Sequence, residues 1–150
     1  RIGGLGKQDG SGNVSYDPAD NEHMIKIRAE KVARIADYIP ELEVNGPEQG
    51  DLLVIGWGGT YGAIRAAVEQ MQHDGFSVAS AHLRHLNPFP RNLGKVLGSY
   101  RQVLVPELNL GQLSLLLQAR FPIRVVQLNK VQGQPFKIRE ISAKIRSILA

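Results

Sequence analysis

A short apolar run followed by a cluster of glycines constrains the fold of this chain more than any other feature. The segment reads Asp51-Leu-Leu-Val-Ile-Gly-Trp-Gly-Gly-Thr-Tyr-Gly62, and an amphipathic pattern begins directly after it. An apolar run that ends in glycines is typical of a buried strand, and the pattern after it is typical of a helix. A tight turn between the two presents backbone N–H groups to a ligand or a partner. The segment therefore predicts an α/β fold with a candidate site at this turn.

The rest of the chain repeats the alternation of strand and helix. Helical stripes or leucine-rich faces are expected over residues 63–71, 92–100, 112–121 and 138–148. Further strands are expected over residues 76–83, 102–105 and 123–128. Four strands that alternate with helices indicate an open, mostly parallel sheet covered on both faces, which is a three-layer α/β/α fold.

The N-terminal third has a different character. We expect residues 1–50 to form an arm and a helix between domains, and residues 51–150 to form the compact α/β domain. The helix is expected roughly from Asn21 to Tyr38, with Asp20 or Asn21 as its N-cap. Its apolar face would consist of Ile25, Ala29, Val32, Ala36 and Ile39. Because the chain opens on Arg1 and not on Met, we expect it to be part of a longer polypeptide.

Composition and charge exclude several classes of function. The sequence has no cysteine, so it can form no disulfide and no thiolate metal or iron–sulfur site of its own. No apolar run approaches the ~20 residues that a membrane helix needs, and a cytoplasmic location is the default expectation. Residues 130–150 hold five Lys or Arg residues and one Glu, which accounts for the whole net charge of +4. This basic segment could bind phosphate or nucleic acid, but a solvated face or a contact with an acidic partner is favoured, because aromatic residues are not interleaved with it.

Polar loops that contain glycine or proline follow all four expected strands. In a parallel sheet these loops lie at one edge, where ligands usually bind. We therefore expect a shared rim made of residues 56–62, 84–90, 106–112 and 129–135.

The glycine turn does not match a nucleotide-binding motif. Counted from Gly56, the sixth position is Tyr61, so the Gly-x-Gly-x-x-Gly spacing of dinucleotide sites fails by one residue. No acidic residue closes the next strand, and there is no Gly-Lys-Ser/Thr sequence. For at least one glycine, close packing of the helix on the strand is the favoured explanation.

The other rim residues leave alternatives open. Arg84 could bind a carboxylate or phosphate, or could pair with Glu107. Glu107 could act as a base or orient a cofactor nitrogen, but a helix cap or an interface role is favoured. His82 and His85 lack a third metal ligand, so we expect no metal site.

Four loop sequences, taken together, resemble one enzyme family. Gly-Trp-Gly-Gly-Thr-Tyr-Gly, His-Leu-Arg-His-Leu-Asn-Pro-Phe-Pro, Val-Pro-Glu-Leu-Asn-Leu-Gly-Gln and Leu-Asn-Lys-Val-Gln-Gly-Gln-Pro-Phe occur in this order. They closely resemble the C-terminal part of the α subunit of 2-oxoacid:ferredoxin oxidoreductases, and the 2-oxoglutarate type most of all. Residues 12–32 are similar to the link between domains in that family.

The resemblance implies a fold like the C-terminal domain of transketolase, with five strands and one antiparallel edge strand. It also implies an N-terminal domain in the same subunit and a β subunit that carries Mg²⁺, thiamine diphosphate and an iron–sulfur cluster. The whole complex would decarboxylate a 2-oxoacid oxidatively, form an acyl-CoA and reduce ferredoxin. This chain lacks the Gly-Asp-Gly…Asn motif for thiamine diphosphate, so we expect it to bind none of these cofactors alone.

The leading hypothesis is therefore a non-catalytic domain that assembles the α and β subunits and shapes the approach to the active site or to CoA. We expect no catalytic or metal-binding residue, and no nucleic-acid or membrane partner. The corresponding domain of a transketolase or of a 2-oxoacid dehydrogenase β subunit, and an independent nucleotide- or anion-binding module, remain as alternatives. The candidate interface or ligand-rim residues are Gly58, Gly59, Thr60, Arg84, Asn87, Glu107, Asn109 and Gln112.

Overall fold

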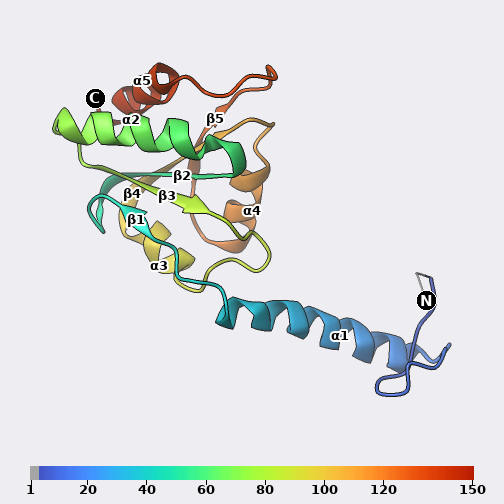
Figure 1. Ribbon diagram of the computed structural model, residues 1–150. Coiled ribbons are helices and arrows are strands. Elements are labelled where there is room, and N and C mark those ends of the chain that lie inside the picture. The colour runs from blue at the N-terminus through green and yellow to red at the C-terminus, as the bar shows by residue number, and fades with distance from the viewer. Residues whose placement is uncertain (1–3) are drawn as a thin grey trace. The chain divides into compact units, whose positions relative to one another are not determined.

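The computed structural model describes residues 4–150 (Figure 1). The chain divides into two compact units, Arg1–Ile39 and Pro40–Ala150, which are described separately. The first unit holds helix α1 (Pro18–Arg34) and the short 3₁₀ helix η1 (Ile35–Asp37). The second unit contains the sheet and every other helix of the described residues.

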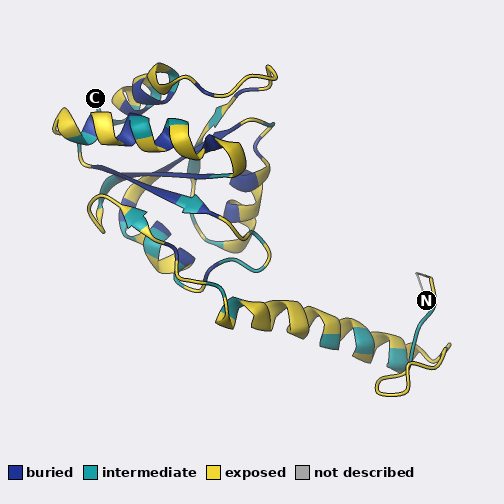
Figure 2. Ribbon diagram, viewed as in Figure 1, coloured by how far each residue is buried: buried dark blue, intermediate teal, exposed yellow. Residues whose placement is uncertain are grey.

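Helix α1 begins earlier than the sequence pattern indicated. Asp17 is its N-cap, because the Asp17 carboxylate accepts a hydrogen bond of 2.8 Å from the Ala19 backbone N–H. Pro18 follows as the first helical residue, a position where its missing N–H costs nothing. The prediction of Asp20 or Asn21 as the cap was therefore wrong. No residue of α1 is buried, and Ile25 is 56% exposed, as the colouring of Figure 2 shows for the helix as a whole.

The second unit is built on a five-stranded sheet in the order β1-β3-β2-β4-β5. Strands β2, β3, β4 and β5 run parallel, and β1 pairs antiparallel with β3 at the edge. The four parallel strands confirm the expected ones, and β1 is the additional antiparallel strand that the family resemblance implied. The strands are β1 (Val44–Asn45), β2 (Gly50–Trp57), β3 (Val78–Leu83), β4 (Tyr100–Glu107) and β5 (Val125–Asn129).

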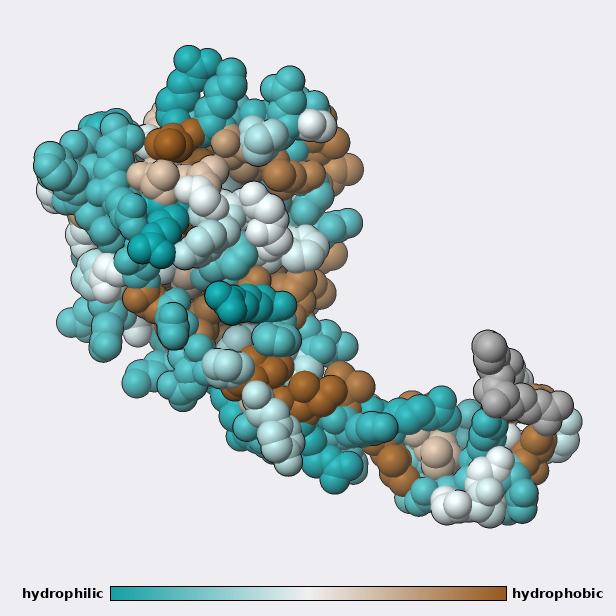
Figure 3. All heavy atoms as spheres, in the orientation of Figure 1, coloured by the Kyte–Doolittle hydropathy of each residue, from teal (hydrophilic) through white to brown (hydrophobic). Residues whose placement is uncertain are grey.

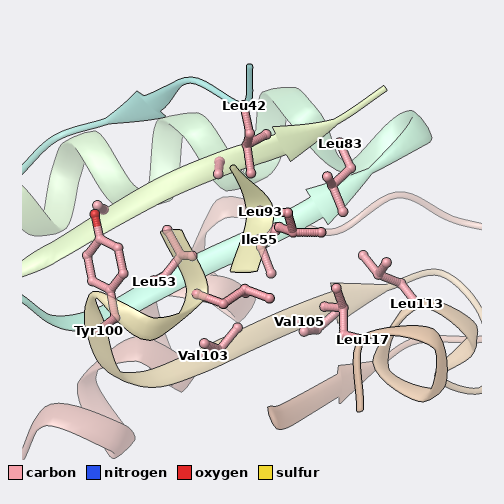
Figure 4. Packing of buried hydrophobic residues seen from close by; sticks show 13 residues of the cluster. Leu42, Leu53, Ile55, Leu83, Leu93, Tyr100, Val103, Val105, Leu113 and Leu117 are labelled. Carbon is pink, nitrogen blue, oxygen red and sulfur yellow. The ribbon is translucent and has the colours of Figure 1, made fainter. Parts of the chain in front are cut away.

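Helices cover both faces of the sheet, which confirms the three-layer α/β/α class (Figure 1). One face packs against α2 and α5. The other packs against α3 and α4, and Figure 4 shows the buried side chains of this second layer. Central strand β2 is apolar on both sides because its residues alternate between the two layers. The helices are α2 (Tyr61–His73), α3 (Leu93–Gly98), α4 (Gln112–Arg120) and α5 (Ile138–Leu149), with the 3₁₀ turn η2 (Gly58–Thr60) before α2.

One glycine of the opening motif is required by packing. A Cβ placed on Gly56 would lie 2.3 Å from Ile64 Cδ1 and 2.6 Å from Thr60 Oγ1, whereas a Cβ on Gly62 would meet nothing within 4 Å. Gly56 therefore lets α2 lie close against the end of β2, as the sequence analysis favoured for at least one glycine.

We expect Gly56→Ala to lower the free energy of unfolding by about 1–3 kcal/mol, because it overpacks the contact between β2 and α2. Gly62→Ala is the matched control and should leave stability unchanged or raise it by up to about 1 kcal/mol. Urea unfolding of the two variants measures the difference. Equal stability of the two variants would contradict this account of Gly56.

Candidate functional site

The carboxyl ends of β2 and β4 form the centre of the rim. Strand β3 lies beside β2 in the sheet, and the chain then crosses over β2 to form β4 on the opposite side of β2. Helices α2 and α4 therefore start on opposite faces of the sheet, and a reversal of this kind is where open α/β sheets usually bind ligands. This reversal brings η2 and the segment 107–112 together, as the sequence analysis predicted for these loops.

The Glu107 carboxylate links the ends of β2 and β4 to the start of α4. Glu107 is fully buried, and its oxygens accept hydrogen bonds from the backbone N–H groups of Leu113 at 2.7 Å and Ser114 at 3.0 Å. The Ser114 hydroxyl donates a further bond of 2.9 Å. Trp57 Nε1, at the end of β2, donates to the same carboxylate at 3.4 Å. Among the alternatives for Glu107, the geometry supports the helix cap, because a negative charge at a helix N-terminus satisfies its free N–H groups.

The neighbouring polar residues fix the backbone of the two turns. Thr60 is buried, and its hydroxyl donates to the Trp57 carbonyl at 2.8 Å, which closes η2. Asn109 Oδ1 accepts from the N–H groups of Gly111 at 2.8 Å and Gln112 at 2.9 Å. Gly111 has φ of 101°, a left-handed conformation that favours glycine. Thr60 and Asn109 therefore hold the turns, whereas Gly58, Gly59 and Gln112 are exposed on the rim.

An ion pair between a buried lysine and a half-exposed glutamate anchors the loop after β5. Lys130 Nζ contacts Glu140 at 2.9 Å and donates to the Pro135 carbonyl at 3.0 Å, with its side chain only 7% exposed. The Lys137 backbone N–H and the Lys130 ammonium both hold the pKa of Glu140 below its ordinary value. Arg146, on α5, likewise pairs with Asp74. Two basic side chains of the C-terminal segment, Lys130 and Arg146, therefore form internal ion pairs. This reduces the positive charge that the segment can offer to an acidic partner.

A hollow of about 340 Å³ lies between these loops. It is lined by Gly59, Leu108, Lys130, Gly133, Gln134 and Pro135. The loops that follow β2, β4 and β5 thus share one concave surface, and this is the part of the rim that the structure brings together.

Arg84 lies in a different hollow, of about 700 Å³, beside the end of β3. The partners of Glu107 described above do not include Arg84, so the suggested ion pair is not formed. His82 lines the same hollow, and its Nδ1 is buried without a hydrogen-bond partner among the described residues. Burial and, to a smaller extent, the Arg84 charge lower the pKa of His82. The Tyr61 ring meets the His82 ring edge-on, with centroids 5.0 Å apart.

Asn87 is exposed and lines neither hollow. It precedes Pro88 through a cis peptide bond. No group of three or more His, Asp or Glu side chains within residues 4–150 could hold a metal ion. No helix in the same range combines the length and the apolar character needed to span a bilayer.

Several residues of the rim were missed by the sequence analysis as site residues. Trp57 and Ser114 complete the environment of Glu107, and Lys130 lines the smaller hollow. Trp57 lies within the opening motif and could have been included from its position at the strand end. Lys130 lies within the expected rim segment 129–135, but its ion pair with Glu140 could not be read from the sequence. Ser114 carries no local signal, because its role depends on a partner on β4.

Fold, rim and sequence together define the class of this protein. Residues 50–141 match the family described as pyruvate:ferredoxin oxidoreductase core domain II, and the chain belongs to that family. The chain is 46% identical, over its whole length, to 2-oxoglutarate oxidoreductase subunit KorA of Mycobacterium tuberculosis, of which it covers 23%. Over 95% of its length it is 30% identical to the alpha subunit of 2-oxoacid:ferredoxin oxidoreductase 2 of Aeropyrum pernix, again covering 23%. It therefore spans about a quarter of the length of these relatives.

Solved structures agree with this assignment. The 2-oxoglutarate:ferredoxin oxidoreductase of Magnetococcus marinus, solved with 2-oxoglutarate, coenzyme A and succinyl-CoA, matches 96% of this chain. The TM-score is 0.90 at 28% identity, and the match covers 26% of that chain. A split-gene transketolase in an inactive tetramer matches 71% of this chain and 41% of its own, with a TM-score of 0.54 at 17% identity, which shows a shared fold alone.

We expect Glu107→Ala to lower the free energy of unfolding by about 2–4 kcal/mol, because buried donors of α4 lose their acceptor. Asn109→Ala is the control and should cost about 1 kcal/mol, because water can reach this half-buried turn. Urea unfolding measures both variants. A larger loss at Asn109 than at Glu107 would contradict the central role given to the carboxylate.

Arg84→Gln should raise the pKa of His82, because removing a positive neighbour makes the imidazolium less unfavourable. The pKa should stay below its ordinary value of 6.5, because burial is the larger cause of the shift. Proton NMR titration of the His82 ring measures the change, with Arg124→Gln, an exposed residue outside that hollow, as the control. An unchanged or lower pKa in the Arg84 variant would show that the two charges do not interact.

Proposed function

We propose that this chain is the core II domain of the alpha subunit of a 2-oxoglutarate:ferredoxin oxidoreductase. The observation that carries the proposal is the 46% identity to KorA along the entire chain. In the complex, a 2-oxoacid would be decarboxylated and oxidised to its acyl-CoA, with ferredoxin as the electron acceptor. Cytoplasmic location, expected from the sequence, is part of the same proposal.

Within that complex the domain would assemble subunits and shape the approach to the active site or to CoA. The geometry supports a structural role, because the buried Glu107 is occupied in capping α4. The rim carries exposed glycines and amides rather than a nucleophile with an adjacent base. The exposed residues Gly58, Gly59, Arg84, Asn87 and Gln112 remain the proposed interface or ligand-rim contacts. Thr60, Glu107 and Asn109 would support that rim by fixing its turns from within.

The cofactors of such a complex do not fit this chain alone. Without cysteine it offers no thiolate for an iron–sulfur cluster. The space at Gly56 is filled by Ile64 and Thr60, so that glycine does not leave room for a diphosphate of the thiamine cofactor. We therefore assign thiamine diphosphate, Mg²⁺ and the cluster to the partner subunit, and CoA to a site that this rim would border.

A second function, binding of an anion in the Arg84 hollow, is favoured by the partnerless Nδ1 of His82 beside the Arg84 charge. Calorimetric titration of the chain with CoA, ADP and thiamine diphosphate tests this alternative. Saturable heat that is lost in Arg84→Gln would support it, and the absence of heat with all three would favour an interface role. The alternative that this chain is the corresponding domain of a transketolase is less well supported, because a match at 17% identity indicates a shared fold alone.

The assembled oxidoreductase tests the main proposal. An alpha subunit that lacks this region should fail to reduce ferredoxin with 2-oxoglutarate and CoA, and adding residues 1–150 in trans should restore the activity. Pyruvate in place of 2-oxoglutarate is the substrate control. Turnover by residues 1–150 alone, or full activity of the truncated complex, would contradict the proposal.

A further inference from the structure

The Arg84 hollow, of about 700 Å³, lies at the β1 edge of the sheet. Its walls come from the start of α2, from the end of β3 with the residues after it, and from the segment 40–45 that leads into β1. All of these residues belong to the compact unit Pro40–Ala150. Figure 3 shows hydrophilic and intermediate residues side by side on the face of this unit where Figure 1 places α2 and the end of β3.

The hollow is open because segment 40–45 pairs with β3 only at its end. Val44 and Asn45 form the whole of β1. Before them, the Leu42 N–H donates to the Asn92 side chain at 2.8 Å, and the same amide donates to the Leu42 carbonyl at 3.0 Å. Because an amide side chain satisfies the backbone of Leu42, this part of the segment has no need to pair with β3. The space beside His82 is therefore left to the hollow.

The outer wall of the hollow carries negative charge. Glu41 and Glu43 line the hollow and are exposed, whereas Leu42 and Val44 between and after them pack into the core. Neither carboxylate forms an ion pair within residues 4–150. Both charges on this wall are therefore available to a ligand.

The inner wall carries positive charge. Arg65, on α2, is already engaged, because its guanidinium donates to Glu69 at 2.8 Å and to the Tyr61 hydroxyl at 2.8 Å. Arg84 has no such side-chain partner in the described part of the chain. The Nδ1 atom of His82 is buried without a hydrogen-bond partner among residues 4–150, so turning this ring toward a ligand would break no hydrogen bond of that atom.

Opposite charges on the two walls select the kind of ligand. A simple anion would be attracted by Arg84 and repelled by Glu41 and Glu43, and a simple cation would meet the reverse. A molecule that carries both charges is attracted by both walls. Ile64 and Pro90 also line the hollow and offer apolar surface to a short aliphatic chain between the two charges.

We propose that this hollow binds a small zwitterion, with its carboxylate at Arg84 and its primary ammonium at Glu41 and Glu43. The inference rests on the second function proposed above, anion binding at Arg84, and names the class of ligand. A guanidinium can hold a carboxylate through two parallel hydrogen bonds, and an ammonium donates to carboxylates.

NMR titration of residues 1–150 with ligands matched in length tests the inference. The first set is 4-aminobutyrate, butyrate and butylamine, and the longer set is 6-aminohexanoate, hexanoate and hexylamine. We expect at least one amino acid to bind at least about threefold more tightly than either matched molecule with a single charge, since a partly exposed ion pair changes affinity by up to about fivefold. The shifts should include the backbone amides of residues 80–85.

Charge variants separate the two ends of the ligand. Arg84→Gln should weaken the binding of the amino acid and of the matched carboxylate alike, by at least about threefold. Glu41→Gln with Glu43→Gln should remove the preference for the amino acid over the matched carboxylate. Glu48→Gln, an exposed carboxylate outside the hollow, is the control and should change neither affinity.

The possible outcomes reject different proposals. The absence of saturable shifts with both amino acids, or shifts that leave residues 80–85 unaffected, would overturn the inference and the anion site with it. Equal binding of the amino acids and their matched carboxylates would keep the anion site and reject the zwitterion. Failure of residues 1–150 to restore oxidoreductase activity in trans would reject the assembly role, whatever the titrations show.

Discussion

The buried carboxylate of Glu107 is the interaction on which the rim depends. It lies at the end of β4, accepts from the first turn of α4 and from the indole of Trp57, and so joins the last residues of two central strands. A buried charge is stable only when several donors surround it. The start of α4 and the end of β2 before η2 are held together by this contact.

Most of the fold could be predicted because it follows from local periodicity. Strand β2 is a continuous apolar run, and α2 repeats apolar residues at helical spacing, so both were expected within a few residues of their bounds. Strand β1 was not found from its sequence, because Val44 and Asn45 are too few to show a period of two. The start of α1 was placed too late because Asp17, Asp20 and Asn21 are all good caps, and only the position of Pro18 selects the first.

The candidate site could be predicted in part. The topology of parallel strands was sufficient to place Gly58, Gly59, Glu107 and Asn109 on one edge. It was not sufficient to separate Arg84 from them, because the order of strands in the sheet decides which loops are neighbours. The ion pair of Lys130 with Glu140 depends on how the loop between β5 and α5 folds back. No spacing in the sequence predicts such a pair.

The alternation of β2 between the two helical layers has a consequence for how the domain comes apart. Leu52 and Val54 belong to the layer of α2 and α5, and Leu53 and Ile55 belong to the layer of α3 and α4. Separating either pair of helices from the sheet would expose one face of β2 to water. Neither layer can therefore open without weakening the packing of the other layer. The domain should therefore behave as one cooperative unit, in which the amide protons of β2 exchange with solvent only when the whole domain unfolds.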